Sequence, residues 1–200
     1  MKVSPKSAKF LWLGNSPALD FVNTQLVQAG VVTDLLASGK DFLLWLREAG
    51  FLPAETAAKQ SGAVLELAVA FARQYRAQLR KGLEQLAAPG SVPDSVIAAT
   101  NELLVADARA VRILRRGKRF DQEAIWRFRE PATFCAPIAY SFADLLSIGD
   151  LSRVRRCKNP QCCLFFYDTS KSGTRSWCSL NICGNRLRIE AFRKRHKREF

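Results

Sequence analysis

The sequence has little of the chemistry on which most enzymes rely. Its only histidine is His196, which lies among lysines and arginines near the C-terminus. A cysteine nucleophile would therefore lack a base. The patterns typical of serine hydrolases, zinc peptidases, phosphate-binding loops and dinucleotide-binding folds do not occur, and carboxylates such as Asp121 and Glu123 have no spacing that marks a catalytic pair. We therefore expect that the protein is not an enzyme.

Long apolar stretches are also lacking. No run reaches the roughly eighteen residues that are needed to span a bilayer. Residues 1–14 contain lysines followed by an apolar patch, but the patch is too short for a signal peptide and no cleavage site of small residues follows. We expect a cytoplasmic protein without a membrane segment. With 200 residues and 48% hydrophobic content, the chain can form one ordinary domain and a small module.

Acidic residues are scarce in the last quarter of the chain. Residues 151–200 contain thirteen lysines and arginines against three acidic residues, and so carry most of the net charge of +13. Five of the six cysteines lie in the same region. This asymmetry favours a polyanionic partner, either nucleic acid or an anionic membrane surface, although a solubilising tail would have the same excess. A helix on a bilayer surface would need a broad apolar face opposite its cations, which the basic segment after Cys183 lacks, so nucleic acid fits better and no membrane partner is expected. The change in composition predicts a domain boundary near residue 150.

Residues 1–150 are predicted to be mainly α-helical with one β-hairpin. Apolar residues recur at three- and four-residue steps along residues 63–88, as on the core-facing side of a long helix. Residues 109–130 alternate in character around the turn-like Arg115–Lys118, which is typical of a hairpin. The other expected elements are a helix at residues 17–28 capped by Ser16, helices at residues 41–50, 94–108 and 131–149, and a short helix or turn that opens at Pro53.

Four cysteines have the spacing of a tetrahedral zinc site. Four residues separate Cys157 from Cys162, four separate Cys178 from Cys183, and fifteen lie between the two pairs. Two thiolates from each of two turns would fill the coordination sphere of one zinc ion, which would then be structural and not catalytic. A module of this size is too small to be held together by burial alone, so the metal would supply stability.

Other uses of these cysteines fit the pattern less well. Cys163 could replace Cys162 as a ligand, but the first spacing would then differ from the second. A disulfide framework is unusual in the cytoplasm, and a redox pair more often has the spacing C-x-x-C. Cys135 lies in an apolar segment and is expected to be a buried bystander.

The C-terminal module is expected to be a small α+β unit, treble-clef-like or ribbon-like. Residues 151–157 and 163–168 would form two short strands around the first cysteine turn, and Trp177 would cover the metal. A helix rich in arginine would follow Cys183, and arginine suits contacts to phosphates and guanines. The predicted nucleic-acid-binding residues are Arg186, Arg188, Arg193, Lys194, Arg195, Lys197 and Arg198, and the patch could be extended by Arg155, Arg156, Lys158, Lys171 and Arg175.

A group of polar residues lies amid apolar ones near the N-terminus. Asp20, Asn23 and Thr24 fall within one turn of the expected first helix, and Asp34 and Trp45 could join them. We favour a buried polar network that fixes helix packing. The alternative is that the five residues line a ligand pocket.

The cysteine-rich region resembles the CGNR zinc-finger family. The resemblance rests on "CKNPQC", on "LFFYDTSKSGTRSWCSLNICGNR" and on the tetrapeptide Cys183–Arg186 that gives the family its name. Cys163 stands where this family is expected to have glycine. The upstream "LGNSPALDFVNT", chiefly Leu19, Asp20, Asn23 and Thr24, with the segments around Asp34 and Trp45, is similar to the ABATE domain.

The resemblance implies a bacterial, stress-induced transcription regulator in two parts. Residues 1–150 would be an ABATE-like helical domain that senses a small molecule or a partner, and residues 151–200 would be a CGNR-type zinc finger that binds DNA. The expected partners are DNA, a small-molecule effector and a second copy of the chain in a homodimer. An RNA- or ribosome-associated zinc module is the alternative, because the same charge and metal would serve it.

Overall fold

A computed structural model of the chain describes residues 9–28, 30–52, 61–86, 92–106 and 108–189. The α-helices in these parts are α1 (Pro17–Val22), α2 (Gly39–Glu48), α4 (Gly62–Leu86), α5 (Asp94–Leu104) and α6 (Ala136–Ser147). The strands are β1 (Gln25–Gln28), β2 (Val31–Asp34), β3 (Arg109–Arg116), β4 (Arg119–Trp126), β5 (Val154–Arg156) and β6 (Phe165–Tyr167). Consecutive strands pair as three antiparallel two-stranded sheets. No helix in the described ranges is both long enough and apolar enough to cross a bilayer.

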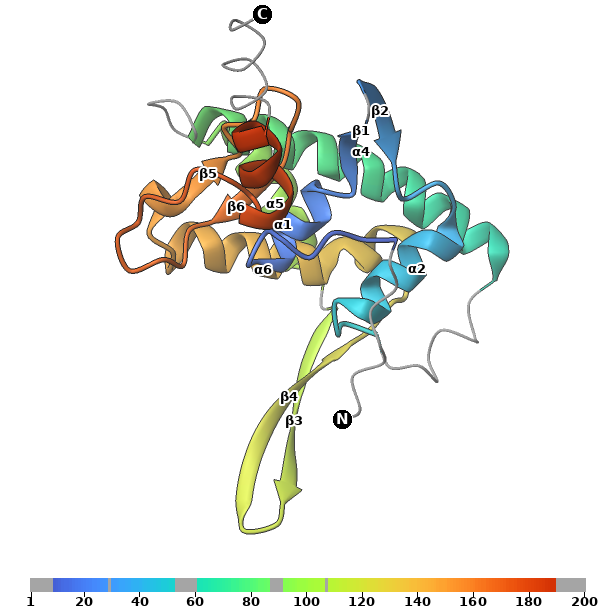
Figure 1. Ribbon diagram of the computed structural model, residues 1–200. Helices are drawn as coiled ribbons and strands as arrows, with labels where there is room; N and C mark the ends of the chain where they lie inside the picture. The colour runs from blue at the N-terminus through green and yellow to red at the C-terminus, as the bar shows by residue number, and fades with distance from the viewer. Residues whose placement is uncertain (1–8, 29, 53–60, 87–91, 107, 190–200) are drawn as a thin grey trace, which may run out of the picture.

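The main core is built around α4, which the three- and four-residue apolar spacing predicted. Its buried face includes Leu65, Ala72 and Leu79, and α1, α2, α5 and the 3-10 turn Pro131–Cys135 pack against it. Figure 1 shows α4 running across the body of the molecule above α1 and α6. The expected turn at Pro53 lies outside the described residues, as do residues 87 and 88 at the end of the predicted helix.

The prediction of a single helix over residues 17–28 is wrong. α1 ends at Val22, and β1 then pairs with β2 around a turn in which Gly30 has a φ of 81°. The Thr24 hydroxyl donates to the Phe21 carbonyl, which competes with helical hydrogen bonding. β-branched valines beyond this point favour a strand. Leu26 consequently packs against the cysteine-rich module and not on the face of a longer helix.

The predicted hairpin at residues 109–130 is confirmed. β3 and β4 pair over their full length, from Arg109 opposite Trp126 to Arg116 opposite Arg119. Gly117 at the turn has a φ of 62°, a conformation that glycine adopts without strain. The hairpin projects from the body of the molecule, as Figure 1 shows.

The predicted helix at residues 131–149 is divided into two parts. A 3-10 turn occupies Pro131–Cys135, and α6 begins directly after it with Pro137 in its first turn, where proline is tolerated. Cys135 lies at this junction and is fully buried. Burial raises the pKa of its thiol, which keeps it protonated and unreactive, as expected of a bystander.

The cysteine-rich module shares its core with the rest of the chain. Val154 of β5 and Phe165 of β6 belong to the main hydrophobic cluster. The Asn23 side chain donates to the Phe165 carbonyl at 2.8 Å and accepts from the Phe165 N–H at 2.9 Å. A side-chain amide thus occupies the edge of β6 as a neighbouring strand would.

Further hydrogen bonds extend this contact along β6 and from α4. Tyr167 N–H donates to the Gly14 carbonyl at 2.8 Å, and the Asn15 side chain donates to the Tyr167 carbonyl at 2.9 Å. From α4, the Arg80 guanidinium donates to the carbonyls of Val22, Gln25 and Cys163. The hydrophobic core is therefore continuous across the change in composition near residue 150.

Replacing Asn23 with alanine should destabilise the protein by about 2–4 kcal/mol, because it leaves two buried backbone groups of Phe165 without partners. Urea unfolding of the purified variant measures the loss. Asn15→Gly is the matched control, since the bond of Asn15 to Tyr167 is exposed and glycine adopts the backbone φ of 58° at this position without strain; the change should cost less than about 0.5 kcal/mol. Equal losses in the two variants would contradict this account of Asn23.

Candidate metal centre and nucleic-acid interface

Four cysteines converge at the centre of the C-terminal module. The Sγ atoms of Cys157, Cys162, Cys178 and Cys183 all lie within 4.8 Å of one another. Three of the side chains are buried and that of Cys162 is partly exposed. Four soft sulfur donors in one enclosed cluster suit a tetrahedral zinc ion, and they leave no coordination position for a substrate. The arrangement is that of one structural zinc site.

The first pair of cysteines is held by the turn that follows β5. The Asn159 carboxamide oxygen accepts from Gln161 N–H at 3.0 Å, and the Asn159 carbonyl accepts from Cys162 N–H at 2.9 Å. Cys157 N–H donates to the Leu164 carbonyl just before β6 begins. The predicted pair of strands on either side of this turn is confirmed, because β5 and β6 pair antiparallel.

Of the second pair, Cys178 directly precedes the cap residue Ser179, and Cys183 lies on the π-helical turn Leu180–Gly184, which leads into a helix over residues 185–189. The Ser179 hydroxyl accepts from Ile182 N–H, and its carbonyl accepts from Cys183 N–H at 3.0 Å. A Cβ atom on Gly184 would lie 3.3 Å from the Trp177 ring. Glycine is therefore the residue that lets the turn close against Trp177, which packs beside the cysteine cluster as expected.

The proximity of the four sulfurs changes their affinity for protons. Hydrogen bonds from Cys162 and Cys178 lower the pKa of Cys157, which also accepts from the Cys178 N–H at 3.5 Å. The same sulfur contacts raise the pKa values of Cys162 and Cys178. The cluster therefore stabilises one thiolate and leaves protons on other sulfurs. A divalent metal would displace those protons, because it binds thiolates and not thiols.

Cys163 lies outside the cluster. Its sulfur faces the Gln25 carbonyl at 3.9 Å, toward β1, and it is not among the four convergent cysteines. All six cysteines are free of disulfides. The arrangement in which Cys163 replaces Cys162 as a ligand is therefore not the one observed.

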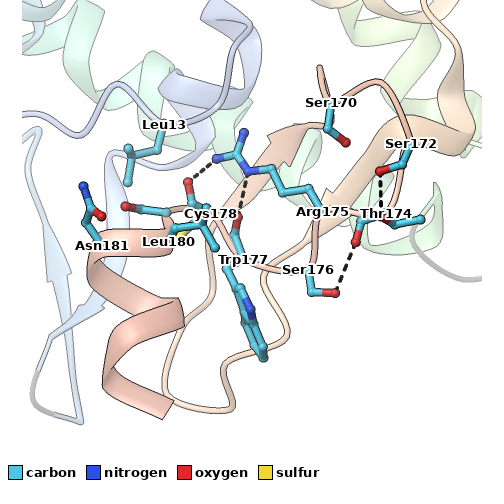
Figure 2. A pocket seen from close by; sticks show the side chains of 11 residues that line it. Leu13, Ser170, Ser172, Thr174, Arg175, Ser176, Trp177, Cys178, Leu180 and Asn181 are labelled. Carbon is cyan, nitrogen blue, oxygen red and sulfur yellow. Dashed lines mark hydrogen bonds between the residues drawn. The ribbon is translucent and has the colours of Figure 1, made fainter. Parts of the chain in front are cut away.

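Arg175 braces the metal centre, a role that the sequence analysis did not identify. Its Nε donates to the Trp177 carbonyl at 2.8 Å, and its Nη2 donates to the Cys178 carbonyl, as Figure 2 shows. The guanidinium also lies 4.4 Å from the centre of the Phe166 ring. The only signal in the sequence is the position of an arginine three residues before a ligand.

Asp168 organises the loop between the two pairs of cysteines. It is fully buried and accepts from Ser170 N–H, from the Ser170 hydroxyl and from Arg175 N–H. Burial opposes its ionisation, but these hydrogen bonds outweigh burial and keep the pKa of Asp168 below its usual value. Arg155 lies 3.6 Å from the same carboxylate and donates to the Gly173 carbonyl. Arg155 and Arg175 are thus engaged inside the module, whereas Arg156, Lys158 and Lys171 are exposed.

An open cavity of about 660 Å³ lies beside the second pair of cysteines. Its walls come from Leu13 and from the segment 170–181, and Figure 2 shows the hydroxyl side chains of this loop around Arg175. Several of these hydroxyls bond within the loop, for example Ser172 with Thr174 at 2.8 Å. The hollow is therefore a feature of the loop that Asp168 organises.

The start of the basic helix is exposed. Arg186 and Arg188 follow the last cysteine at once, both are exposed, and neither makes an ion pair with another described residue. Bracing of the metal loop therefore depends on Arg175 and not on Arg186. The other predicted nucleic-acid-binding residues, Arg193, Lys194, Arg195, Lys197 and Arg198, lie outside the described residues.

The five polar and aromatic residues near the N-terminus make internal contacts. Asp20 accepts from Gly14 N–H at 2.7 Å, and Asn23 binds Phe165 as described above. Thr24 and Asp34 both accept from Arg76, a fully engaged guanidinium that is 3% exposed. These contacts are those of a polar network that fixes packing.

The remaining member of this group, Trp45, is buried among aromatic rings. It stacks on Trp12 with 5.8 Å between ring centres and meets Phe21 edge-on. None of the five residues lines the cavity of Figure 2. The ligand pocket predicted for them stays a prediction.

Comparison with known protein families gives two matches. The model of the ABATE family, described as "Putative stress-induced transcription regulator", matches residues 15–149. The model of the CGNR zinc finger matches residues 153–196, which include all four cysteines of the cluster. No curated protein matches the chain. Both families are of the regulator or zinc-finger type, and the metal that the cluster would bind is zinc.

Replacing Cys162 with serine should abolish stoichiometric zinc binding, whereas Cys163→Ser should leave one zinc per chain, because only Cys162 points into the sulfur cluster. Metal content of freshly reduced protein, measured by atomic emission or with a chromogenic chelator, distinguishes the two. Retention of zinc by Cys162→Ser together with loss in Cys163→Ser would show that the ligands are exchanged.

Asp34→Asn removes the ion pair with Arg76 and should destabilise the protein by about 2 kcal/mol at pH 7. This loss is smaller than that expected for breaking a fully buried ion pair, because Asp34 is partly exposed. Burial raises the pKa of Asp34, but Arg76 outweighs it and holds the pKa below the ordinary 3.8. The contribution is therefore complete above pH 3.8 and is lost as the pH falls through the lower folded-state value.

Urea unfolding at a series of pH values tests this dependence. The exposed hairpin pair of Asp121 with Arg116 provides the control, since Asp121→Asn should cost less than about 0.5 kcal/mol at any pH. A difference between wild type and Asp34→Asn that persists unchanged at pH 2 would contradict the assignment to the ion pair.

Proposed function

The chain belongs to the ABATE family, and from this premise we propose that it is a zinc-finger transcription regulator that binds DNA through its C-terminal module. The observation that carries the proposal is the junction at Cys183. The fourth sulfur of the cluster is followed within five residues by two exposed arginines, neither of which forms an ion pair with a residue in the described part of the chain. A structural metal would thus fix the start of a basic helix relative to the rest of the module.

The metal would act on the fold and not on a substrate. When bound, zinc supplies four strong bonds that hold the two turns together. Cys157 and Cys162 would hold it from the turn after β5, Cys178 from the segment just before the π-helical turn, and Cys183 from that turn. Arg175 keeps the second turn closed by binding its carbonyls. The chain's own residues thereby orient Arg186 and Arg188 outward.

DNA is favoured over RNA as the ligand by the burial of the module's aromatic residues. Sequence-specific RNA recognition commonly stacks unpaired bases on exposed aromatic rings. Phe165 and Phe166 are fully buried, and Tyr167 is partly buried with its hydroxyl accepting from Asp150 N–H. The exposed charged side chains among residues 151–189 are all cations, which suit the phosphates and guanines of a duplex.

Sensing by residues 1–150 is the second part of the proposal. An effector or a homodimer contact that moved the segment around Asn23 would act directly on β6, because Asn23 holds both backbone groups of Phe165. Arg80 offers a second route, since it binds the carbonyls of Val22 and Cys163 together. In a cytoplasmic, stress-responsive regulator these contacts would couple the sensor to the orientation of the basic helix.

Binding of the zinc-loaded protein to a mixed pool of DNA fragments, at rising salt, tests the proposal. Retention of a subset of fragments would identify a sequence-specific site. Arg186→Gln/Arg188→Gln should lower the slope of log affinity against log salt by about 2, because two phosphate contacts are lost, while the zinc content stays at one per chain.

The matched control is Lys40→Gln/Arg47→Gln, which removes two exposed charges from α2. It should leave the slope unchanged. Preferential binding of structured RNA in competition with duplex DNA, or equal effects of the two double variants, would overturn the assignment of the basic helix to DNA.

A further inference from the structure

The β3–β4 hairpin is the most prominent feature that the proposed function leaves unused. At its base, Trp126 meets Phe51 and Tyr140 edge-on, with ring centres 5.8 and 5.4 Å apart. Arg109 lies over the Tyr140 ring at 4.9 Å. Beyond this anchor the two eight-residue strands extend into solvent for about 26 Å. An arm that is fixed at its base and bare along its length is suited to contact another molecule.

The two sides of this hairpin differ in charge. Residues paired across an antiparallel ladder lie on the same side, and side chains alternate along each strand. Both acidic residues therefore share one side, and each is neutralised there: Glu123 by Arg112 at 2.5 Å and Asp121 by Arg116 at 2.8 Å. The opposite side, here called the open side, consists of Arg109, Val111, Ile113, Arg115, Phe120, Gln122, Ala124 and Trp126. It carries no acidic residue.

The open side combines cations with uncovered apolar groups. Val111, Ile113 and Phe120 are 56%, 69% and 62% exposed, which is unusual for large apolar side chains that lie side by side. Arg115 lies over the Phe120 ring at 4.8 Å. The open side is therefore complementary to a ligand that carries both negative charge and exposed apolar groups.

The tip of the hairpin is strongly basic. Arg115, Arg116, Lys118 and Arg119 surround the turn at Gly117, and only Arg116 has an acidic partner among the described residues. Four cations within five residues repel one another unless an anion lies between them. The tip thus adds charge complementarity to a polyanion.

We propose that the β3–β4 hairpin is a second DNA-binding element, a β-ribbon that enters the major groove of a duplex with its open side toward the bases. A two-stranded ribbon fits the width of this groove. Arginines can bind guanine edges and phosphates there, and the exposed apolar side chains can contact thymine methyl groups. The proposal extends the function proposed above, because it assigns the same class of ligand to a different surface.

A second copy of the chain fits the hairpin less well. β3 carries Arg109, Arg112, Arg115 and Arg116 and no acidic residue, so pairing two β3 edges would bring eight guanidinium groups together. Two open sides packed face to face would likewise oppose arginines with arginines. Like charges directly opposite one another destabilise a sheet. The charge pattern therefore favours a polyanion.

The position of the hairpin implies that it holds a separate stretch of DNA. In Figure 1 the hairpin projects from one end of the molecule, and the helix that carries Arg186 and Arg188 lies at the opposite end. In this view α1 and α6 lie between them. Because the two elements point away from each other in this view, we expect them to contact separate segments of DNA, so that each chain would bridge two duplexes.

A capture experiment with the full-length, zinc-loaded chain tests the proposal. The protein is loaded onto an immobilised 30-base-pair duplex of mixed sequence, and retention of a second, fluorescent duplex is measured. Arg115→Gln/Lys118→Gln/Arg119→Gln removes three hairpin charges and leaves both hairpin ion pairs intact. Lys40→Gln/Arg47→Gln/Lys81→Gln removes three exposed charges from α2 and α4 and serves as the matched control.

We expect wild type and the control to retain the second duplex, and the hairpin variant to lose it while staying on the first. In a chain whose seven predicted nucleic-acid-binding residues after Cys183 are all replaced with glutamine, where the hairpin would be the main remaining site, the three hairpin substitutions should lower the magnitude of the salt slope by about 2.7. Far-UV circular dichroism and zinc content, unchanged in all variants, exclude misfolding.

Two results would overturn the hairpin proposal and leave the finger assignment standing. The first is a hairpin variant that retains the second duplex as well as the control does. The second is a wild type that is dimeric by light scattering and a hairpin variant that is monomeric, with the same DNA binding per chain. The hairpin would then be a contact between two copies of the chain. Conversely, DNA binding that is lost in the hairpin variant and unaffected by the Arg186/Arg188 changes would support the hairpin and refute the finger.

Discussion

The structure depends on the fact that a four-cysteine module of this size cannot bury enough apolar surface to stand alone. At one end of the module, where the sulfurs converge, metal coordination would supply the missing stability. The other end is completed by the N-terminal part of the chain, which places Asn23 along the edge of β6 and takes Phe165 into its own core. The cysteine-rich module is thus stabilised both by its metal site and by the hydrophobic core that it shares with the N-terminal part. Neither part of the chain is structurally independent of the other.

Because the module packs on the N-terminal part, the polar residues near the N-terminus lie where they can hold the two parts together. Thr24 and Asp34 accept hydrogen bonds from Arg76. Arg80, one turn further along α4, donates to the carbonyls of Gln25 in β1 and of Cys163. Arg76 is buried and Arg80 is partly buried, and guanidinium groups in such places keep their position only when the carbonyls and carboxylates around them are correctly placed. The network therefore specifies the angle at which the cysteine-rich module meets α4.

Local patterns in the sequence predicted the local parts of this structure. The periodicity of α4, the alternation of β3 and β4, and the two cysteine spacings all gave correct elements, because each is determined by neighbouring residues. The structure after Val22 was predicted wrongly. The helical pattern continues in the sequence, but the side chain of Asn23 hydrogen-bonds to a strand about 140 residues away. Arg175 and Arg80 were missed for the same reason: their partners are backbone carbonyls, which have no signature in a sequence.

The use of backbone groups at the junction has an evolutionary consequence. Asn15, Asn23 and Arg80 all bind main-chain atoms of the cysteine-rich module, at Tyr167, Phe165 and Cys163. Every amino acid except proline supplies these atoms, so side chains elsewhere in the module can be exchanged without loss of its contacts with the N-terminal part of the chain. If the chain binds DNA as proposed, its descendants could therefore change the DNA sequence that they recognise while they keep the same contacts between the N-terminal part and the cysteine-rich module.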